Sequence, residues 1–469
     1  MKSKFILTAI LSASYSLLMA QGNNFTLQQC VDYAMINSSK IQNAVLDEQL
    51  AAEKVKEIKG IGLPQAKLSH TVVDNTAIQQ AFLPSSAFSG GTAGLLELLK
   101  AGSDPVLKGG AEQALAEFAK NPDIVPVGFG VKYNLITQAS VTQLIFDGSY
   151  LVGLQAAKTY KDLAIKSTQM NKLDVIQNVH KAYYMVLVNA ERKKIFTNNI
   201  SRLDTIFRQT KALNQAGFVE KIEVTRLEVT FNNLLVEKMK FDNLYDLSVE
   251  LLKFQIGMPS SEALAVSQKI TDFQVAQLSG DPQVSFGNRP EYGLLQTQKA
   301  LYELDLKNQK FARLPSVAAF GNFGFNNGSN KFDVYTTKNY EFSNIGLAIN
   351  MPLFDGFQKY RKGQQAKLNI QKTNNSIVAL EKGIAIQSKV AQIQLKNSIE
   401  TLNNQRSNVT LAEEVARVSK EKYSKGVGSS LEVTNAESEL KTAQINYFES
   451  LYNSLINKVE LDAALGTLK

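Results

Sequence analysis

The chain has 469 residues, a net charge of +8 at pH 7, two histidines and a single cysteine. Acidic and basic residues are interspersed along it rather than gathered into a basic face, so the charge pattern does not favour a nucleic-acid-binding protein. A lone cysteine excludes an internal disulfide, and the residues before Cys30 lack the small side chains of a lipoprotein processing site. We therefore expect Cys30 to be a packed helix residue.

Residues 1–20 have the features of a secretory signal peptide. Lys2 and Lys4 precede an apolar run over residues 5–19, and cleavage is expected after Ala20. The run is too short to serve as a spanning helix, and no later stretch is apolar for long enough to cross a bilayer as a helix. Any membrane crossing must then be made by strands.

A first repeat is expected over residues 21–257, and it opens with a helix. Thr26 is a suitable N-cap, and apolar positions at helical spacing follow it. Glycines and a proline within residues 60–64 end this helix. Residues 65–73 then predict a strand.

Residues 74–126 are rich in Gly, Pro, Ser and Ala and are expected to form a long loop, with a short helical segment near residues 111–120. Apolar residues alternate with small or polar ones from Val127 to Leu135. This alternation predicts a half-apolar strand that runs on toward Phe146.

Two helices of unusual length are predicted next to the strands. Residues 148–216 and 356–425 contain no proline and keep helical periodicity, so each can extend on the order of 100 Å at ~1.5 Å per residue. Each is followed by a glycine turn and a returning helix: Gly217 and residues 219–257 in the first hairpin, Gly426, Gly428 and residues 429–466 in the second. Such hairpins pack as coiled coils.

The chain is an internal duplication. Phe146-Asp147-Gly148 recurs as Phe354-Asp355-Gly356, about 209 residues further on. A connection over residues 258–285 leads into the second repeat, residues 286–469, which is expected to contain a helix, two strands and the second hairpin. The Asp of each Asp-Gly pair is expected to cap the helix that follows, and the Gly is expected to permit the bend.

The strands of the second repeat alternate clearly. Around residues 317–326 and 344–353, one face is apolar and the other is small or polar, which is typical of a lipid-facing barrel strand with a wet interior. An ordinary antiparallel sheet covering a core is the alternative. Two copies supply four strands, whereas bacterial membrane barrels begin at about eight. Several chains must then share one barrel.

With these features, the chain resembles the TolC-like outer-membrane efflux protein family, the outer membrane factors. The likeness covers the mature chain and rests on the duplication, the Phe-Asp-Gly segments, the turn Tyr423–Gly426 leading into Leu431-Glu432-Val433, and the terminal segment 463–468. The resemblance implies an α+β membrane protein that is mostly α. Its expected form is a trimeric 12-stranded β-barrel, with four strands per chain, continued by a long α-helical coiled-coil barrel.

The resemblance also implies a function. It predicts the outer-membrane channel of a tripartite efflux or type I secretion system, a passive trans-periplasmic conduit that exports drugs, small molecules or polypeptides. Expected partners are two further copies of the chain, outer-membrane lipid, a periplasmic adaptor (membrane fusion) protein and an inner-membrane RND or ABC transporter, with no nucleic acid. The expected location is the cell outer membrane, extending into the periplasm. The alternative is a periplasmic coiled-coil structural or adaptor protein without a pore.

In the resembling family, two acidic residues three apart ring the lumen at the hairpin tip. The matching positions here are Glu432 and Asn435, so one acid is retained; a solvated carboxylate at a helix start is the alternative for Glu432. The first repeat has Glu223 and Arg226 there, whose spacing also permits an ordinary salt bridge within the helix. Candidates for an adaptor-docking tip are Gly217, Tyr423, Gly426 and Gly428.

Enzymatic motifs do not emerge from the sequence. His70 and His180 have no cysteine or clustered carboxylate at ligand spacing, so neither predicts a metal site. No nucleophile elbow, kinase-type signature or phosphate loop is recognisable. The chain is expected to be a non-enzyme without a cofactor.

Overall fold

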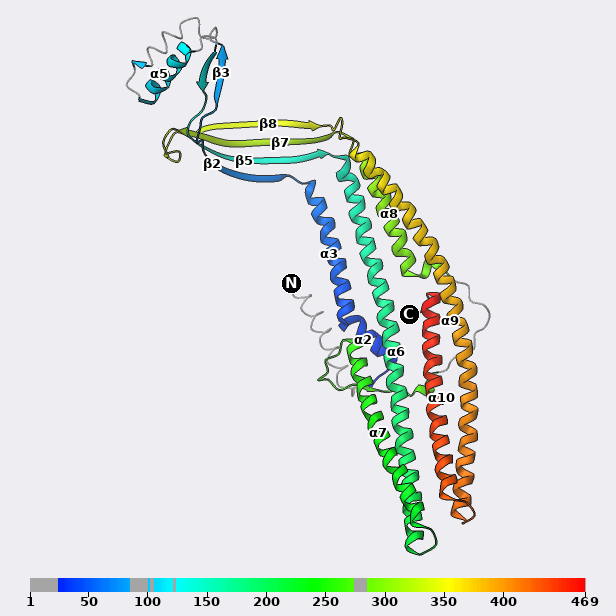
Figure 1. Cartoon of the computed structure of the whole chain (residues 1–469). Coiled ribbons are helices and arrows are strands. Elements are labelled where there is room, and N and C mark those ends of the chain that lie inside the picture. The colour runs from blue at the N-terminus through cyan, green and yellow to red at the C-terminus, as the bar shows by residue number, and fades with distance from the viewer. Residues whose placement is uncertain (1–23, 85–99, 102–104, 121–123, 274–284, 469) are drawn as a thin grey trace, which may run out of the picture. The chain divides into compact units, whose positions relative to one another are not determined.

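The computed structural model describes residues 24–84, 100–101, 105–120, 124–273 and 285–468 (Figure 1). The expected signal peptide lies outside the described residues. The chain divides into two compact units, one made of Glu57–Gly153 and Asn308–Lys359, the other of Met1–Lys56, Leu154–Lys307 and Tyr360–Lys469. In the part of the chain that the structure describes, no helix combines the length and apolar composition needed to cross a membrane.

The first of these units contains a four-stranded antiparallel sheet in the order β2-β5-β7-β8. Its strands lie side by side in Figure 1 and are β2 (Gln65–Asp74), β5 (Tyr133–Phe146), β7 (Ser316–Ser329) and β8 (Tyr340–Asn350). The first two belong to the first repeat and the last two to the second. The prediction of four strands shared between two repeats is therefore confirmed, with β2 and β8 as the edges.

The two faces of this sheet differ in chemistry. Side chains alternate between faces along a strand, and paired residues share a face. Leu68, Phe323, Ile345 and Leu347 fall on one face and are largely exposed, Ile345 at 92%. The opposite face carries mainly small and polar side chains, among them Asn322. The predicted apolar and polar alternation is thus present in the folded strands.

The segment between β2 and β5 is more structured than the sequence predicts. A hairpin pairs β3 (Gln80–Pro84) with β4 (Ile124–Gly128), and helix α5 (Pro105–Lys120) lies between them in sequence. The expected continuous strand from Val127 onward is wrong. Gly130, at φ 143°, separates β4 from β5, a backbone conformation that glycine adopts without strain.

The helical unit contains both predicted hairpins. Helix α6 (Gly148–Gln215) returns as α7 (Lys221–Ile256), and α9 (Gln358–Ser424) returns as α10 (Ser430–Leu465). The lengths and turns predicted from the absence of proline are confirmed. Figure 1 shows the two turns at the same end of this unit.

The N-terminal helix is interrupted where one continuous helix is predicted. Thr26 caps α2 (Leu27–Asn37) through a capping box with Gln29, and α3 (Ser39–Ile61) begins directly after Ser38, whose backbone is extended. The predicted cap and the predicted end near residue 61 are confirmed.

A large apolar core joins α2 to both hairpins. It includes buried side chains of α2, α6, α7 and α10, such as Val31, Tyr183, Leu252 and Leu455. Cys30 is fully buried in the same cluster, which confirms its expected packing role. The described part of the connection contains β6 (Ala265–Val266), which pairs in parallel with β1 (Asn24–Phe25), and the 3-10 turn Ile270–Asp272. The second repeat opens with the 3-10 turn Phe286–Asn288 and α8 (Pro290–Phe311).

Candidate functional site

The two hairpin turns lie beside each other and share an apolar core. Phe196, Leu203 and Ile206 of α6 and Leu227 of α7 are buried together with Val433 of α10. Since Val433 comes from the second repeat, the core ties the two hairpins into one tip. The sequence-predicted tip residues of both repeats are thereby brought together.

Two tip glycines have the backbone conformation that favours glycine. Gly217 has φ 81° and Gly426 has φ 75°, and nothing lies near the position a Cβ would take on either. Their role is conformational, because a left-handed backbone costs other residues roughly 1–2 kcal/mol. Gly428 differs: a Cβ there would lie 3.0 Å from Lys422 Cβ, so a larger residue would have to displace Lys422 slightly.

Glu223 makes two contacts at the start of α7. It accepts a 3.0 Å hydrogen bond from Arg226 Nη1, so the ordinary salt bridge that the spacing permits is present. It also accepts a hydrogen bond from the hydroxyl of Ser430, a buried residue at the start of α10. Glu223 therefore connects the two returning helices and is not a free carboxylate.

Glu432 and Asn435 occupy a different environment. Both side chains are exposed on the first turns of α10, and the backbone N–H of Glu432 donates to Ser429 Oγ at 3.1 Å. Ser429 thus provides the N-cap of α10. The Glu432 carboxylate stays available to solvent or to a neighbouring molecule.

Tyr423 joins the tip of the second hairpin to the first. Its hydroxyl forms a hydrogen bond with the hydroxyl of Thr210 on α6, which is fully buried. Thr210 also donates to the carbonyl of Ile206, one turn earlier in the same helix.

Two ion pairs reinforce the junction further from the turns. Arg202 Nε donates to Glu437 Oε2 at 2.7 Å, and Lys441 Nζ donates to Glu237 Oε2 at 2.8 Å. A cleft of about 100 Å³ is lined by Glu237, Glu437 and Lys441 of these pairs and by Asn199. Sequence reasoning missed Thr210, Ser430 and both ion pairs, because their partners lie more than 200 residues away and carry no local signal.

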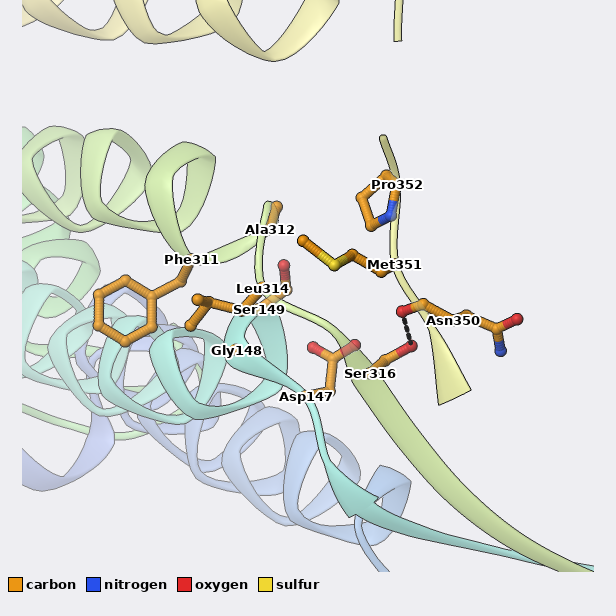
Figure 2. A pocket seen from close by; sticks show the side chains of 10 residues that line it. All are labelled: Asp147, Gly148, Ser149, Phe311, Ala312, Leu314, Ser316, Asn350, Met351 and Pro352. Carbon is orange, nitrogen blue, oxygen red and sulfur yellow. Dashed lines mark hydrogen bonds between the residues drawn. The ribbon is translucent and has the colours of Figure 1, made fainter. Parts of the chain in front are cut away.

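A second cavity, of about 420 Å³, lies where the strands meet the helices (Figure 2). Asp147 is the one carboxylate among its ten lining residues, and it accepts a 2.7 Å hydrogen bond from the N–H of Tyr150. Asp355 does the same for Lys359 N–H at 3.0 Å, so the predicted helix-capping role of both is confirmed. Gly148 allows close approach rather than a bend, since a Cβ there would lie 2.5 Å from the Phe311 carbonyl oxygen.

The histidines lie apart from these sites. His180 is on α6, where burial lowers the pKa of its imidazole and Asp462 acts in the opposite sense; its Nδ1 is buried without a hydrogen-bond partner. His70 is on β2, beside Thr137 at 2.8 Å. Within the described ranges, no three His, Cys, Asp or Glu side chains group as metal ligands would.

Comparison with known proteins agrees with this architecture. Residues 295–467 match the family model described as outer membrane efflux protein. The outer membrane protein TolC of Escherichia coli (strain K12) is 23% identical over 404 residues, which span 78% of this chain and 80% of that protein. Nodulation protein T of Rhizobium leguminosarum bv. trifolii is 21% identical over 338 residues, 70% of this chain and 71% of that protein.

The fold is also found among solved structures. The Campylobacter jejuni CmeC outer membrane channel superposes with a TM-score of 0.68 at 17% identity, covering 94% of this chain and 86% of that one. This chain resembles the TolC-like outer membrane efflux proteins over most of its length. Its location is the outer membrane, extending into the periplasm. The solved structures that share its fold include the outer membrane channels CmeC and MtrE.

Proposed function

We propose that this chain is the outer-membrane channel of a tripartite efflux or type I secretion system, a passive trans-periplasmic conduit for drugs, small molecules or polypeptides. The observation that carries the proposal is the two-faced sheet with free edges at β2 and β8. In a bilayer, unpaired edge N–H and C=O groups cost several kcal/mol each, so the sheet requires further strands.

The further strands come from other copies of the chain. Three copies of a four-stranded sheet give the 12-stranded barrel that the family resemblance implies, and closure removes every edge. The apolar face of Leu68, Phe323 and Ile345 then meets lipid, and the polar face lines the lumen. The helical hairpins of the three copies form the coiled-coil barrel in the periplasm.

The hairpin tips are the proposed entrance and docking site. The exposed Glu432 of three copies forms a ring of carboxylates, with Asn435 one turn further along. Glu223 and Arg226 contribute indirectly: their salt bridge and the hydrogen bond from Ser430 to Glu223 position the start of α10. Gly217, Tyr423, Gly426 and Gly428 shape the surface that meets a periplasmic adaptor protein. An RND or ABC transporter in the inner membrane supplies the energy.

Oligomeric state and conductance test the channel. Outer-membrane extracts should contain a trimer that resists detergent and dissociates on heating, and the purified trimer should give discrete single-channel currents in planar bilayers. Heat-dissociated protein serves as the control and should give none. A folded, bilayer-embedded single chain without conductance would contradict the proposal.

Adaptor docking is tested by photo-crosslinking in cells. A crosslinking residue in place of Val427, which is 77% exposed at the second tip, should capture a periplasmic adaptor. Phe82 on β3, exposed at 72%, is the matched control and should capture none. Equal capture of the adaptor at Val427 and Phe82 would exclude the hairpin tip as a specific docking site.

A further inference from the structure

A row of side-chain amides crosses the polar face of the sheet. Gln138 of β5 donates from Nε2 to Asn322 Oδ1 of β7 at 2.9 Å, and Asn322 donates from Nδ2 to Asn344 Oδ1 of β8 at 2.8 Å. Three strands thus contribute to one connected, uncharged row. Its members fix each other's orientation, so the remaining amide donors and acceptors point to whatever fills the space above this face.

Lys67 of β2 lies at the level of this row. Its pairing partner across β2 and β5 is Ser140, which in turn pairs with Asn322 of β7, and Asn322 pairs with Asn344 of β8. Residues paired across strands share a face, so Lys67 projects on the amide side. Its side chain is exposed.

Lys67 is the one charged side chain on this face within the four described strands. By register, the face consists of Gln65, Lys67, Ser69, Thr71 and Val73 on β2; Asn134, Ile136, Gln138, Ser140 and Thr142 on β5; alternate residues from Ser316 to Gly328 on β7; and alternate residues from Tyr340 to Asn350 on β8. None of these is an aspartate or glutamate. The Lys67 charge therefore has no compensating partner on the face.

Two phenylalanines of the face, Phe320 and Phe342, lie against glycines. A Cβ on Gly346 would lie 2.6 Å from Phe320 Cζ, and one on Gly324 would lie 3.1 Å from Phe342 Cζ. Each ring therefore covers a neighbouring strand at a position without a side chain.

We propose that Lys67, together with the Gln138–Asn322–Asn344 row, forms an anion-attracting ring inside the barrel. The proposal rests on the proposed function, because three copies must close a barrel with this face inward. Three ammonium groups then stand at one level of the lumen, amid amide N–H donors that also bind anions. The ligands are chloride and the carboxylate, phosphate or sulfonate groups of anionic solutes in transit.

The ring opposes the carboxylates of Glu432 at the tip. A solute crosses a cation-favouring entrance and then an anion-favouring barrel, so the net ion preference depends on both. The Lys67 contribution is also predicted to depend on salt, because the screening length is ~10 Å at about 0.1 M and ~3 Å at about 1 M.

The experiment measures reversal potentials of single trimers under a KCl gradient. Lys67→Gln should lower the chloride-to-potassium permeability ratio by about twofold at about 0.1 M salt, and the difference should fade toward about 1 M. Lys67→Arg keeps the charge and should retain the wild-type ratio. Asn344→Asp places a carboxylate at the same level and offsets the Lys67 charge, so it should shift the ratio in the same direction as Lys67→Gln.

Each variant is also measured in a Glu432→Ala background, which removes the tip carboxylates and exposes the barrel contribution. If conducting trimers of Lys67→Gln and Lys67→Arg share the wild-type ratio in both backgrounds, the ring is overturned while the channel stands. If wild-type protein forms no conducting trimer, the proposed function itself fails. These two failures are therefore distinguishable.

Discussion

Arg202 on α6 and Glu437 on α10 form an ion pair, with the guanidinium Nε 2.7 Å from the carboxylate oxygen. The Glu437 side chain is 11% exposed, so the carboxylate depends on this partner more than a surface residue would. The pair is one of the contacts that hold the first repeat against the second at the hairpin tips. It therefore links the two hairpins directly.

Arg202→Gln should loosen the tip. Leaving the largely buried Glu437 without its cation should cost roughly 1–2 kcal/mol, between the values for exposed and fully buried pairs. Hydrogen exchange of the backbone amides around both turns should accelerate, while exchange in the core around Tyr183 should not change. Arg208→Gln is the matched control, since Arg208 pairs with Asp204 of its own helix and is 78% exposed. Equal acceleration in both variants would contradict a cross-hairpin role.

Gly426→Ala should destabilise the second turn. A left-handed backbone at φ 75° costs a residue with a Cβ roughly 1–2 kcal/mol, although space around it is free. Limited proteolysis should then cut the turn faster, and Gly426→Asn should show a smaller effect because asparagine tolerates this conformation. Gly383→Ala, in the interior of α9, should not increase cleavage at the turn. If Gly426→Ala were cleaved at the same rate as wild type, the turn would have relaxed to another conformation without strain.

The long hairpins could be predicted from the sequence because the signals are local. Absence of proline, helical periodicity and a glycine after each helix determine α6 and α9 to within a few residues. The interruption at Ser38 could not be predicted in this way. Gly257, which ends α7, packs against Asn37: a Cβ on Gly257 would lie 2.4 Å from the Asn37 carbonyl oxygen. The break between α2 and α3 therefore coincides with a tertiary contact to the end of α7.

The candidate site was predictable in part. Matching positions located Glu432 and Asn435 on an exposed helix start, and the spacing of Glu223 and Arg226 predicted their salt bridge. The bond from Ser430 to Glu223 was not predictable, because hydroxyl and carboxylate are 207 residues apart in sequence and meet only when the two hairpins pack.

Glu432→Ala should reduce the preference of the channel for cations. Its exposed carboxylate stands at the start of α10, and a threefold ring of carboxylates in a narrow entrance attracts cations and repels anions. Asn435→Asp adds a second ring one turn further along and should increase the preference. Asn435→Ala removes no charge and provides the control. The measurement is the reversal potential of single channels; an unchanged value in Glu432→Ala would exclude Glu432 from the pore ring.

Cys30 should resist thiol reagents in the folded protein. Burial raises the pKa of its thiol to about 12, so the thiolate is scarce at neutral pH and the sulfur is also shielded. Labelling by a maleimide should begin only as denaturant unfolds the core of α2. In a Cys30→Ala background, Ile36→Cys introduces a thiol at a position that is 58% exposed and should label at once. Rapid labelling of native Cys30 would mean that α2 detaches readily.

His180 should make the helical unit less stable in mild acid. Burial lowers its pKa below the ordinary value near 6.5, while Asp462 acts in the opposite sense, so the folded state holds fewer protons than the unfolded state. Stability is then complete above about pH 7.5, falls as the pH drops through the unfolded value near 6.5, and levels off below the folded pKa. Burial is the structural cause, and Nδ1 also lacks a hydrogen-bond acceptor for the proton that a charged imidazole would carry.

The measurement is the melting temperature of the detergent-solubilised protein as a function of pH. His180→Gln removes the titrating group at similar size and should flatten the curve between about pH 5 and pH 7.5. At the alkaline end of that range, the comparison of the two proteins reports only the packing change and serves as the internal reference. If wild type and His180→Gln lose the same number of degrees on acidification, carboxylates rather than His180 determine the acid sensitivity.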